Sequence, residues 1–302
     1  MEITNSSNQH IVSNRRAFLK QGMLWMASSA ASLSSMAAEP TTQNPVMQIG
    51  LITDVHYADK TPADTRHYRD SMAKIRRSIS EFNRVPVDFA AELGDYVDAA
   101  ETVEAEIGYL KTIDAELQKF AGARHYVLGN HCVWSLTKTQ FLETVRQTNS
   151  FYSFDHNDFH FIVLDACFRG DEVAYGEKNY EWTDTEIPVA EREWLADDLQ
   201  KTKHKSIVFL HQRLDIEGHY TVKSAPAVRR ILEQSGKVLA VFQGHYHQND
   251  YQEINGIHYC TLAAMIEGAG TENDAYSILK IFVDGAMQLV GFGNQTDYAL
   301  SS

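Results

Sequence analysis

Between residues 47 and 247 the chain repeatedly follows a short apolar segment with a helical pattern, and this alternation restricts its possible folds. The segments that we expect to form strands are 47–53, 87–93, 124–128, 206–210 and 238–243. The segments that predict helices are 66–83, 101–120, 137–147, 189–203 and 225–234. In the first of these, apolar residues recur every three or four positions, as on one face of a helix. Strands that alternate with helices favour an α/β fold.

The other segments fit the same single domain, which we expect to span residues 39–302. Segments 151–154 and 159–166 alternate like paired strands, and segment 167–188 has no clear period, which predicts a loop. Asn255-Gly256 and Asp284-Gly285 are typical hairpin turns, so the tail is expected to be antiparallel. The chain contains no repeat, no low-complexity linker and no break in composition.

Residues able to bind metals follow five of the apolar segments. They are Asp54 and His56, Asp95 and Asp98, Asn130 and His131, His211, and finally His245 and His247. In α/β sheets, ligands bind at the carboxyl ends of the strands, so these side chains are expected to meet there. Residues two apart in an extended segment project to one side, which would bring Asp54 toward His56 and His245 toward His247.

This set combines carboxylates, imidazoles and one amide oxygen, and it lacks a thiolate. Such ligands are typical of sites for manganese, iron, zinc or nickel, and they are not typical of a structural zinc site. A carboxylate shared by two cations about 3.5–4 Å apart allows a bridging hydroxide, which can attack phosphorus in an in-line displacement. The pattern therefore predicts a dinuclear centre that hydrolyses phosphate esters or pyrophosphate bonds.

The motifs D-x-H, G-D-x-x-D, G-N-H, H and G-H-x-H occur in this order from residue 54 to residue 247. In this the chain resembles the calcineurin-like metallophosphoesterase superfamily. The resemblance implies a four-layer α/β/β/α sandwich of two mixed β-sheets. It also implies one divalent metal held by Asp54, His56, Asp95 and His247, and a second held by Asp95, Asn130, His211 and His245. In that pattern, His131 binds the transferring phosphoryl group and helps to protonate the leaving oxygen, and Asp98 orients His131.

The segments 54–59 and 66–71 are more specifically similar to the manganese-dependent ADP-ribose/CDP-alcohol diphosphatases, which makes manganese the favoured metal. His56 departs from that branch, which often has glutamine there. Cys132 also departs, because an acid usually follows the Asn-His pair. Asp98 stands where a purple acid phosphatase needs tyrosine, so that subclass is disfavoured.

Residues outside the motifs give candidate substrate contacts. Arg213 and His219 follow His211 in one loop, and either side chain could contact a phosphate. The expected loop 167–188 carries four aromatic residues that could stack on a nucleobase or simply fix the loop to the body, namely Phe168, Tyr175, Tyr180 and Trp182. The expected partner is a small phosphorylated substrate.

Composition excludes several classes of protein. With 44% hydrophobic and 22% charged residues, the chain is neither a disordered, a collagen-like nor a disulfide-scaffold sequence. A net charge of −13 repels nucleic-acid backbones, so we expect no nucleic-acid partner. The only cysteines, Cys132, Cys167 and Cys260, are too few and too widely spaced for a disulfide framework, although a single bridge through Cys167 is open.

Residues 1–38 resemble a bacterial twin-arginine export signal. Arg15 and Arg16 precede Phe18 and Leu19, and a weakly apolar stretch ends in small residues. The resemblance implies cleavage, export of the folded protein by the twin-arginine machinery, and a periplasmic or secreted location. The alternative is a transmembrane anchor, but a stretch of about 17 residues that is dense in serine is short and polar for a bilayer span, so no stable span is expected.

Two functions from different classes remain at this point. The first is a metal-dependent phosphoesterase that hydrolyses phosphate esters or nucleotide-type pyrophosphate bonds. The alternative is a catalytically degenerate protein that holds metals and a phosphate ligand without cleaving it, and Cys132 is the sequence feature that supports it.

Overall fold

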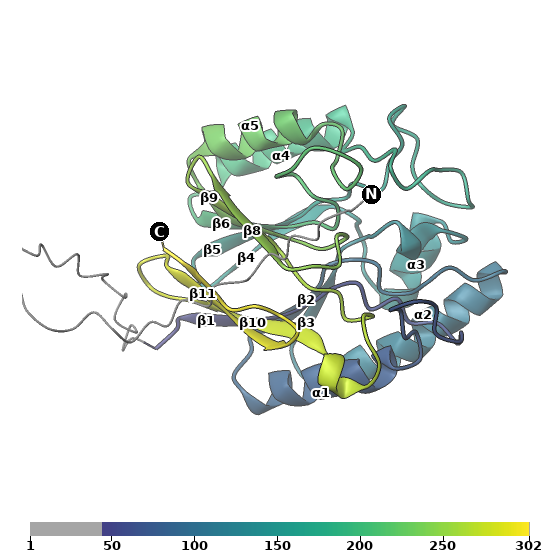
Figure 1. Ribbon diagram of the computed structural model, residues 1–302. Helices are drawn as coiled ribbons and strands as arrows, with labels where there is room; N and C mark the ends of the chain where they lie inside the picture. Colours follow the sequence, from purple (N-terminus) through teal and green to yellow (C-terminus); the bar gives the residue numbers. More distant parts are fainter. Residues whose placement is uncertain (1–43, 302) are drawn as a thin grey trace, which may run out of the picture. The chain divides into compact units, whose positions relative to one another are not determined.

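The structure is a computed structural model that describes residues 44–301. The expected export signal at residues 1–38 lies outside the described residues. Two six-stranded sheets face each other, and helices cover the outer face of each sheet (Figure 1). This is the expected α/β/β/α arrangement of two mixed sheets.

The first sheet has the strand order β12-β11-β10-β1-β2-β3. Its strands are β1 Met47–Ile52, β2 Phe89–Glu92, β3 Ala123–Tyr126, β10 Ala275–Ile281, β11 Met287–Gly293 and β12 Tyr298–Leu300. Strands β1, β2 and β3 are parallel, whereas β10, β11 and β12 pair antiparallel. The helices that pack with this sheet are α1 Ser71–Arg84, α2 Val103–Leu117 and α3 Lys138–Val145.

The second sheet has the strand order β4-β5-β6-β7-β9-β8. Its strands are β4 Tyr152–His156, β5 Phe159–Val163, β6 Lys205–Phe209, β7 Val238–Gln243, β8 Asp250–Ile254 and β9 Ile257–Thr261. The strands β5, β6, β7 and β9 are parallel, and β4 and β8 pair antiparallel at the edges. Its helices are α4 Val189–Lys201 and α5 Ala225–Ser235.

Three hydrophobic clusters correspond to the three interfaces between layers. Neighbouring strand residues point to opposite faces, so Leu51 packs between the sheets while Ile52 packs against α1 and α2. In the second sheet, Phe161 lies between the sheets and Ile162 faces α4 and α5. Each sheet is therefore buried on both faces, which explains why the sequence shows near-continuous apolar runs for the parallel strands.

Most expected elements are present, with boundaries that shift by a few residues. The largest difference is α1, which begins at Ser71, because Ala63 and Arg66 form a tight bridge just before it. Thr137 caps α3 in a reciprocal capping box with Gln140. Two 3₁₀ turns, η1 His131–Val133 and η2 Thr271–Asn273, were not predicted.

Two further features bear on expectations from the sequence. Cys132, Cys167 and Cys260 are all buried free thiols, so the single bridge that the sequence allows does not form. Within residues 44–301, no helix combines the length and the hydropathy that a membrane crossing requires.

A buried histidine joins three elements at one side of the second sheet. His160 on β5 lies 2.6 Å from Asp155 of β4 through Nδ1 and 2.8 Å from Asp198 of α4 through Nε2. Burial opposes protonation of the imidazole, but the hydrogen bonds to Asp198 and Asp155 outweigh it and raise the pKa of His160. An imidazolium bonded to two carboxylates therefore ties α4 to the β4–β5 hairpin.

Replacing His160 with glutamine should reduce stability in a pH-dependent manner. The pKa is higher in the folded than in the unfolded state, so the contribution is fully present below the unfolded value and is lost as pH rises through the folded value. We expect H160Q to lose about 1–2 kcal/mol near pH 5.5 and less near pH 9. Urea unfolding of both proteins at the two pH values measures this, and an equal loss at both would contradict the charged bridge.

Candidate metal centre

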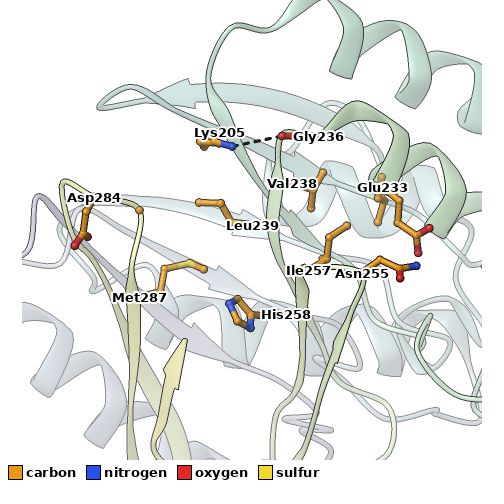
Figure 2. Close-up of a pocket in the computed structure, with 13 residues that line it drawn as sticks. Lys205, Glu233, Gly236, Val238, Leu239, Asn255, Ile257, His258, Asp284 and Met287 are labelled. Carbon is orange, nitrogen blue, oxygen red and sulfur yellow. Dashed lines mark hydrogen bonds between the residues drawn. The ribbon is translucent and has the colours of Figure 1, made fainter. Parts of the chain in front are cut away.

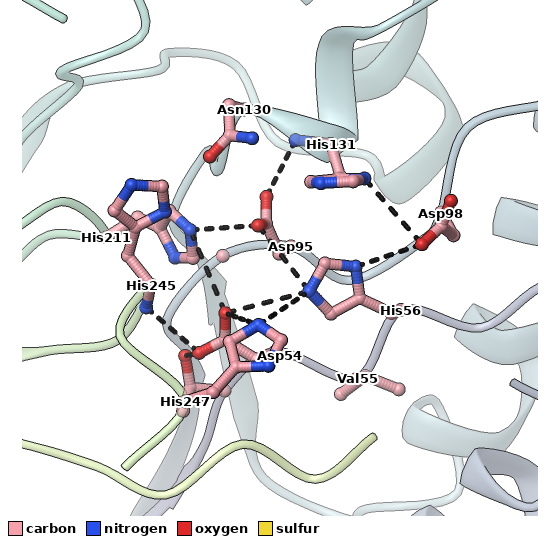
Figure 3. Close-up of polar contacts among 12 residues, drawn as sticks. Asp54, Val55, His56, Asp95, Asp98, Asn130, His131, His211, His245 and His247 are labelled. Atoms are coloured by element: carbon pink, nitrogen blue, oxygen red, sulfur yellow. Dashed lines mark hydrogen bonds and ion pairs between the residues drawn. The ribbon is translucent and has the colours of Figure 1, made fainter. Parts of the chain in front are cut away.

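The residues expected to bind metals converge at one end of the two sheets. Figure 3 shows their side chains directed toward a common region, although they come from distant parts of the chain. Some of these residues come directly after strands β1, β2 and β3 of the first sheet. The others come directly after strands β6 and β7 of the second sheet. The converging residues are Asp54, His56, Asp95, Asp98, Asn130, His131, His211, His245 and His247.

The backbone at this end is folded into left-handed conformations. Five of the expected ligands have positive φ, namely Asp54 (51°), His56 (44°), Asp95 (55°), His245 (69°) and His247 (65°). The expectation that residues 54–56 and 245–247 are extended is therefore wrong, although their side chains do reach the same place. A left-handed non-glycine residue costs about 1–2 kcal/mol, and such strain concentrates at functional sites.

One group of side chains surrounds Asp54 Oδ1. This oxygen lies 3.3 Å from His247 Nε2 and 3.7 Å from His56 Nε2. The two imidazole nitrogens are 3.2 Å apart. Two imidazole nitrogens at this distance either share a proton or bind one cation. The ligand atoms of Asp54, His56 and His247 also lie close enough together to hold a metal ion.

A second group surrounds the carboxylate of Asp95. Its Oδ2 lies 3.0 Å from His211 Nε2, and His245 supplies a further imidazole in reach of the same point. Asp95 Oδ2 also lies 3.6 Å from His56 Nε2, which belongs to the first group. This oxygen therefore stands between the two groups, the position expected of a carboxylate shared by two cations.

Several polar atoms at these points are buried and lack a hydrogen-bond partner among residues 44–301. They are Asp54 Oδ1, Asn130 Oδ1, His211 Nε2 and His245 Nε2, and two of them, Asp54 Oδ1 and His211 Nε2, have only the ion-pair contacts described above. Leaving one such group unsatisfied costs about 1–3 kcal/mol, and this many in one place calls for an additional partner. Carboxylate oxygen, amide oxygen and imidazole nitrogen all bind divalent transition metals, so the residues fit the expected pair of cations.

Hydrogen bonds fix which nitrogen of each imidazole faces the centre. His211 donates from Nδ1 to the carbonyl of Leu93 at 2.9 Å, which directs Nε2 toward Asp95. His247 donates from Nδ1 to Glu267 at 2.6 Å, which directs Nε2 toward Asp54. Partners of this kind orient metal ligands and raise their affinity. Burial opposes protonation of His247, but Asp54 and Glu267 raise its pKa to about 9, so Nε2 must release a proton when it binds a cation.

The segment that carries Glu267 is itself held by a buried lysine. Lys74 of α1 donates to the carbonyls of Met265, Glu267 and Gly268, each at 2.8 Å. Helix α1 thereby fixes the position of the carboxylate that orients His247.

Close contacts between carboxylates and imidazoles set the protonation states of the centre. Burial raises the pKa of the Asp54 carboxyl, but His247 and His211 outweigh it and hold that pKa well below its usual range. The same balance, with His211 and His131 as the main partners, lowers the pKa of Asp95. Burial next to His211 lowers the pKa of His245 to about 3. The carboxylates are therefore ionised and His245 is neutral, which is the state in which each binds a metal.

His131 and Asp98 lie at the open side of the centre. His131 Nδ1 is 3.7 Å from Asp98 Oδ2, and its side chain is 28% exposed. The same oxygen lies 3.3 Å from His56 Nδ1, so Asp98 contacts two imidazoles where the sequence suggested one. The backbone N–H of His131 donates to Asp95 Oδ1 at 2.7 Å, which ties this residue to the shared carboxylate.

The structure separates the two suggested substrate contacts. Arg213 is 1% exposed, and its guanidinium is bound by Asp215 at 2.6 and 3.0 Å and by Asp250 at 2.6 Å. A buried arginine neutralised by two carboxylates holds its loop in place, and these contacts argue against the phosphate contact suggested for Arg213. His219 is exposed in the same loop, beside Tyr220, and its contact with substrate stays a prediction.

The aromatic residues of loop 167–188 also divide into two kinds. Tyr175 and Tyr180 are buried and stacked with ring centroids 3.7 Å apart, and the Tyr180 hydroxyl donates to the carbonyl of Asn130. They fix the loop to the body. Trp182 is 39% exposed, and its ring lies 5.5 Å from His245 and 5.4 Å from Tyr220. Trp182 and Tyr220 thus form an aromatic wall at the rim of the centre.

Sequence reasoning missed several residues of this region. Glu267 lies in an aperiodic segment after β9, so no spacing rule connects it with His247. Lys60 and Arg66 contact Asp98 at 2.9 and 3.8 Å, and only their place near the 54–59 and 66–71 motif segments pointed to them. Burial raises the pKa of the Glu92 carboxyl well above its usual range, which keeps a neutral acid next to the centre.

A separate cavity of about 450 Å³ contains none of the expected site residues (Figure 2). It is lined by α5, by the turns at Asn255-Gly256 and Asp284-Gly285, and by His258. His258 is already bonded to the Tyr251 hydroxyl and to the carbonyl of Ser301, both at 2.9 Å. The imidazole in this cavity is therefore engaged through both of its nitrogens and is not available as a base or a metal ligand.

Removing the orienting carboxylate should weaken metal binding without unfolding the protein. We expect E267Q to lower manganese affinity by about 10- to 100-fold, as is usual for a lost partner of a ligating histidine. Isothermal titration of metal-free protein with MnCl₂ measures it, and E253Q is the matched control, because Glu253 is exposed on the edge strand β8. Unchanged affinity in E267Q would show that His247 does not need this carboxylate.

Comparison with known proteins agrees with this geometry. The manganese-dependent ADP-ribose/CDP-alcohol diphosphatase of Arabidopsis thaliana is 25% identical over an alignment of 307 positions, which covers 82% of this chain and 95% of the relative. The corresponding enzyme of Oryza sativa subsp. japonica is 23% identical over 85% of this chain and 94% of its own length.

Among solved structures, a dimetal phosphatase from Danio rerio superposes with a TM-score of 0.76 at 22% identity, covering 85% of this chain and 99% of that one. A purple acid phosphatase from yellow lupin gives a TM-score of 0.58 at 14% identity, over 86% of this chain and 54% of that one. Both likenesses concern the fold. The calcineurin-like phosphoesterase family matches residues 47–249. The chain thus belongs to the calcineurin-like phosphoesterase family and is a metal-dependent hydrolase of phosphate ester or phosphoanhydride bonds.

Proposed function

We propose that this protein hydrolyses the pyrophosphate bond of nucleotide-type substrates, with manganese as the favoured metal. The observation that carries the proposal is the set of buried, partnerless ligand atoms that converge around the shared oxygen of Asp95. The similarity to diphosphatases over more than four-fifths of the chain supports this bond type.

Two sets of side chains would hold the cations. Asp54, His56, Asp95 and His247 form the first set, and Asp95, Asn130, His211 and His245 form the second. Divalent cations bound there would supply Lewis acidity toward a phosphoryl oxygen and would lower the pKa of water. The left-handed backbone and the orienting hydrogen bonds hold the ligands in place before any cation arrives, which reduces the cost of binding.

In the hydrolysis, water loses a proton to the solvent as its oxygen attacks phosphorus, and the bond from phosphorus to the leaving oxygen breaks. We assign His131 to protonate that oxygen, because it is the partly exposed imidazole at the open side of the centre. Burial opposes its protonation, but Asp95 and Asp98 raise the pKa of His131, which favours the imidazolium form that a general acid needs. Asp98 would hold the ring in position through Nδ1.

The aromatic wall of Trp182 and Tyr220 supports a substrate that carries a nucleobase. Both rings lie beside His245. Figure 3 shows His245 and the His131–Asp98 pair on different sides of the centre. An exposed tryptophan next to a tyrosine gives a flat base a surface on which to stack. The base would then lie over His245 while the leaving group points toward His131.

An activity panel tests the proposal. Purified protein with added Mn²⁺ should hydrolyse ADP-ribose or CDP-choline with higher kcat/KM than p-nitrophenyl phosphate or bis-p-nitrophenyl phosphate. D95N and H245A should each lower kcat/KM by at least about 100-fold, because each removes a group that stabilises charge in the transition state.

D197N is the control, since the Asp197 side chain is 70% exposed on α4 and lies outside the centre. Full activity in both D95N and H245A would remove the centre from the mechanism. Tight phosphate binding without turnover on any of these substrates would instead favour the degenerate binding protein.

We propose in addition that the protein is exported and acts outside the cytoplasm, on the basis of the paired arginines in residues 1–38. Replacing Arg15 and Arg16 with lysines should leave the protein uncleaved in the cytoplasmic fraction of a bacterial host, while the parent is processed and appears in the periplasm or the medium. Fractionation with immunodetection measures this, and unchanged processing of the double variant would rule out the twin-arginine route.

A further inference from the structure

We propose that Lys60 and Arg66 form a subsite for an anionic leaving group, so that the preferred substrate releases a phosphate-bearing product on the His131 side. The inference rests on the proposed function and adds to it the chemical class of the departing half. Arg213, the cation that the sequence suggested for a phosphate, is buried and neutralised, so the charge must come from other residues.

Both cations meet the centre at a single carboxylate. Lys60 Nζ lies 2.9 Å from Asp98 Oδ1, and Arg66 Nη1 lies 3.8 Å from Asp98 Oδ2. The second of these oxygens is also the one that faces His131 Nδ1 at 3.7 Å. Lys60, Arg66 and the proposed acid are therefore neighbours around Asp98.

Lys60 and Arg66 together carry more positive charge than Asp98 neutralises. Asp98 carries one negative charge and faces two permanent cations. Two other acids of the region are engaged elsewhere, since Asp59 binds Arg69 at 2.6 Å and Glu267 binds His247 at 2.6 Å. The Lys60 and Arg66 side chains are 35% and 34% exposed, so an incoming anion can reach both.

The backbone of this loop is held against the centre. Ala63 and Arg66 exchange two hydrogen bonds of 3.0 and 2.9 Å, and Arg66 also forms a β-bridge with Glu267. The N–H of Gly268 donates to the carbonyl of Thr65 at 2.8 Å. Because Glu267 also orients His247, these backbone contacts anchor Arg66 next to the centre.

The chemistry of the leaving group favours this arrangement. When water attacks a P–O–P linkage, the new bond forms to one phosphorus, and the breaking bond leaves its electron pair on an oxygen of the other phosphate. That oxygen takes a proton from His131, while the remaining phosphate charge needs cations close by. A diester with an uncharged alcohol as leaving group makes no use of Lys60 or Arg66.

Substrate comparison separates this role from simple support of Asp98. K60M and R66M should lower kcat/KM on ADP-ribose and CDP-choline by about 10- to 100-fold each, as expected for a lost charge-assisted hydrogen bond. On bis-p-nitrophenyl phosphate we expect a change of less than about threefold. R84M is the control, because exposed Arg84 pairs with Glu81 at the C-terminal end of α1 and plays no part in the charge balance around Asp98. An equal loss on all substrates would mean that the two cations only position Asp98, and would overturn the proposal.

Equilibrium binding gives a readout independent of turnover. With Mn²⁺ present, the parent should bind adenosine 5′-(α,β-methylene)diphosphate more tightly than AMP, because the second phosphonate reaches the cations. This difference should disappear in the K60M/R66M double variant, and affinity for AMP should stay unchanged. A preserved difference would contradict the subsite. If the parent hydrolyses no substrate but shows the difference, the proposed function fails while the subsite stands.

Discussion

Buried carboxylates and imidazoles are concentrated at one end of the two sheets. The rest of the structure depends on this constraint. Asp54 is fully buried and Asp95 is 2% exposed, and both are surrounded by imidazoles. In the described part of the chain, the inward nitrogen of His245 has no hydrogen-bond partner, and that of His211 has only an ion-pair contact with Asp95. Such an arrangement is costly in a protein interior unless cations complete it. The rigid apolar sandwich holds this cluster in place before metal binds.

The close approach of backbone segments explains why glycine precedes several ligands. A Cβ on Gly129 would lie 2.2 Å from the backbone nitrogen of Asp95, and a Cβ on Gly244 would lie 2.6 Å from Asp54 Oδ2. Loops that leave both sheets pack so tightly at this end that no side chain fits there. The two sheets therefore meet at the centre through proposed ligands from both, and the strain of the five left-handed residues among them is held by this packing.

The layers and the converging residues could be predicted because they depend on local patterns. Several apolar strands are followed directly by Asp, Asn or His. Because the carboxyl ends of parallel strands lie at one edge of a sheet, these residues could be expected to meet there. The backbone conformation at Asp54 and His56 could not be predicted, because the spacing of residues alone does not distinguish an extended from a left-handed segment. Glu267 and the pairing of Arg213 with Asp250 depend on contacts between residues far apart in sequence, for which a single chain carries no periodic signal.

The central claim is that two cations share Asp95, one beside Asp54 and His247 and the other beside His211 and His245. The most direct measurement is a crystal structure of the manganese-loaded protein with anomalous scattering recorded at the manganese edge. The account predicts two anomalous peaks, one on each side of the Asp95 carboxylate, each in contact with the ligand atoms that are partnerless in the protein alone. A well-ordered site without anomalous peaks, or with metal bound only at other residues, would contradict it.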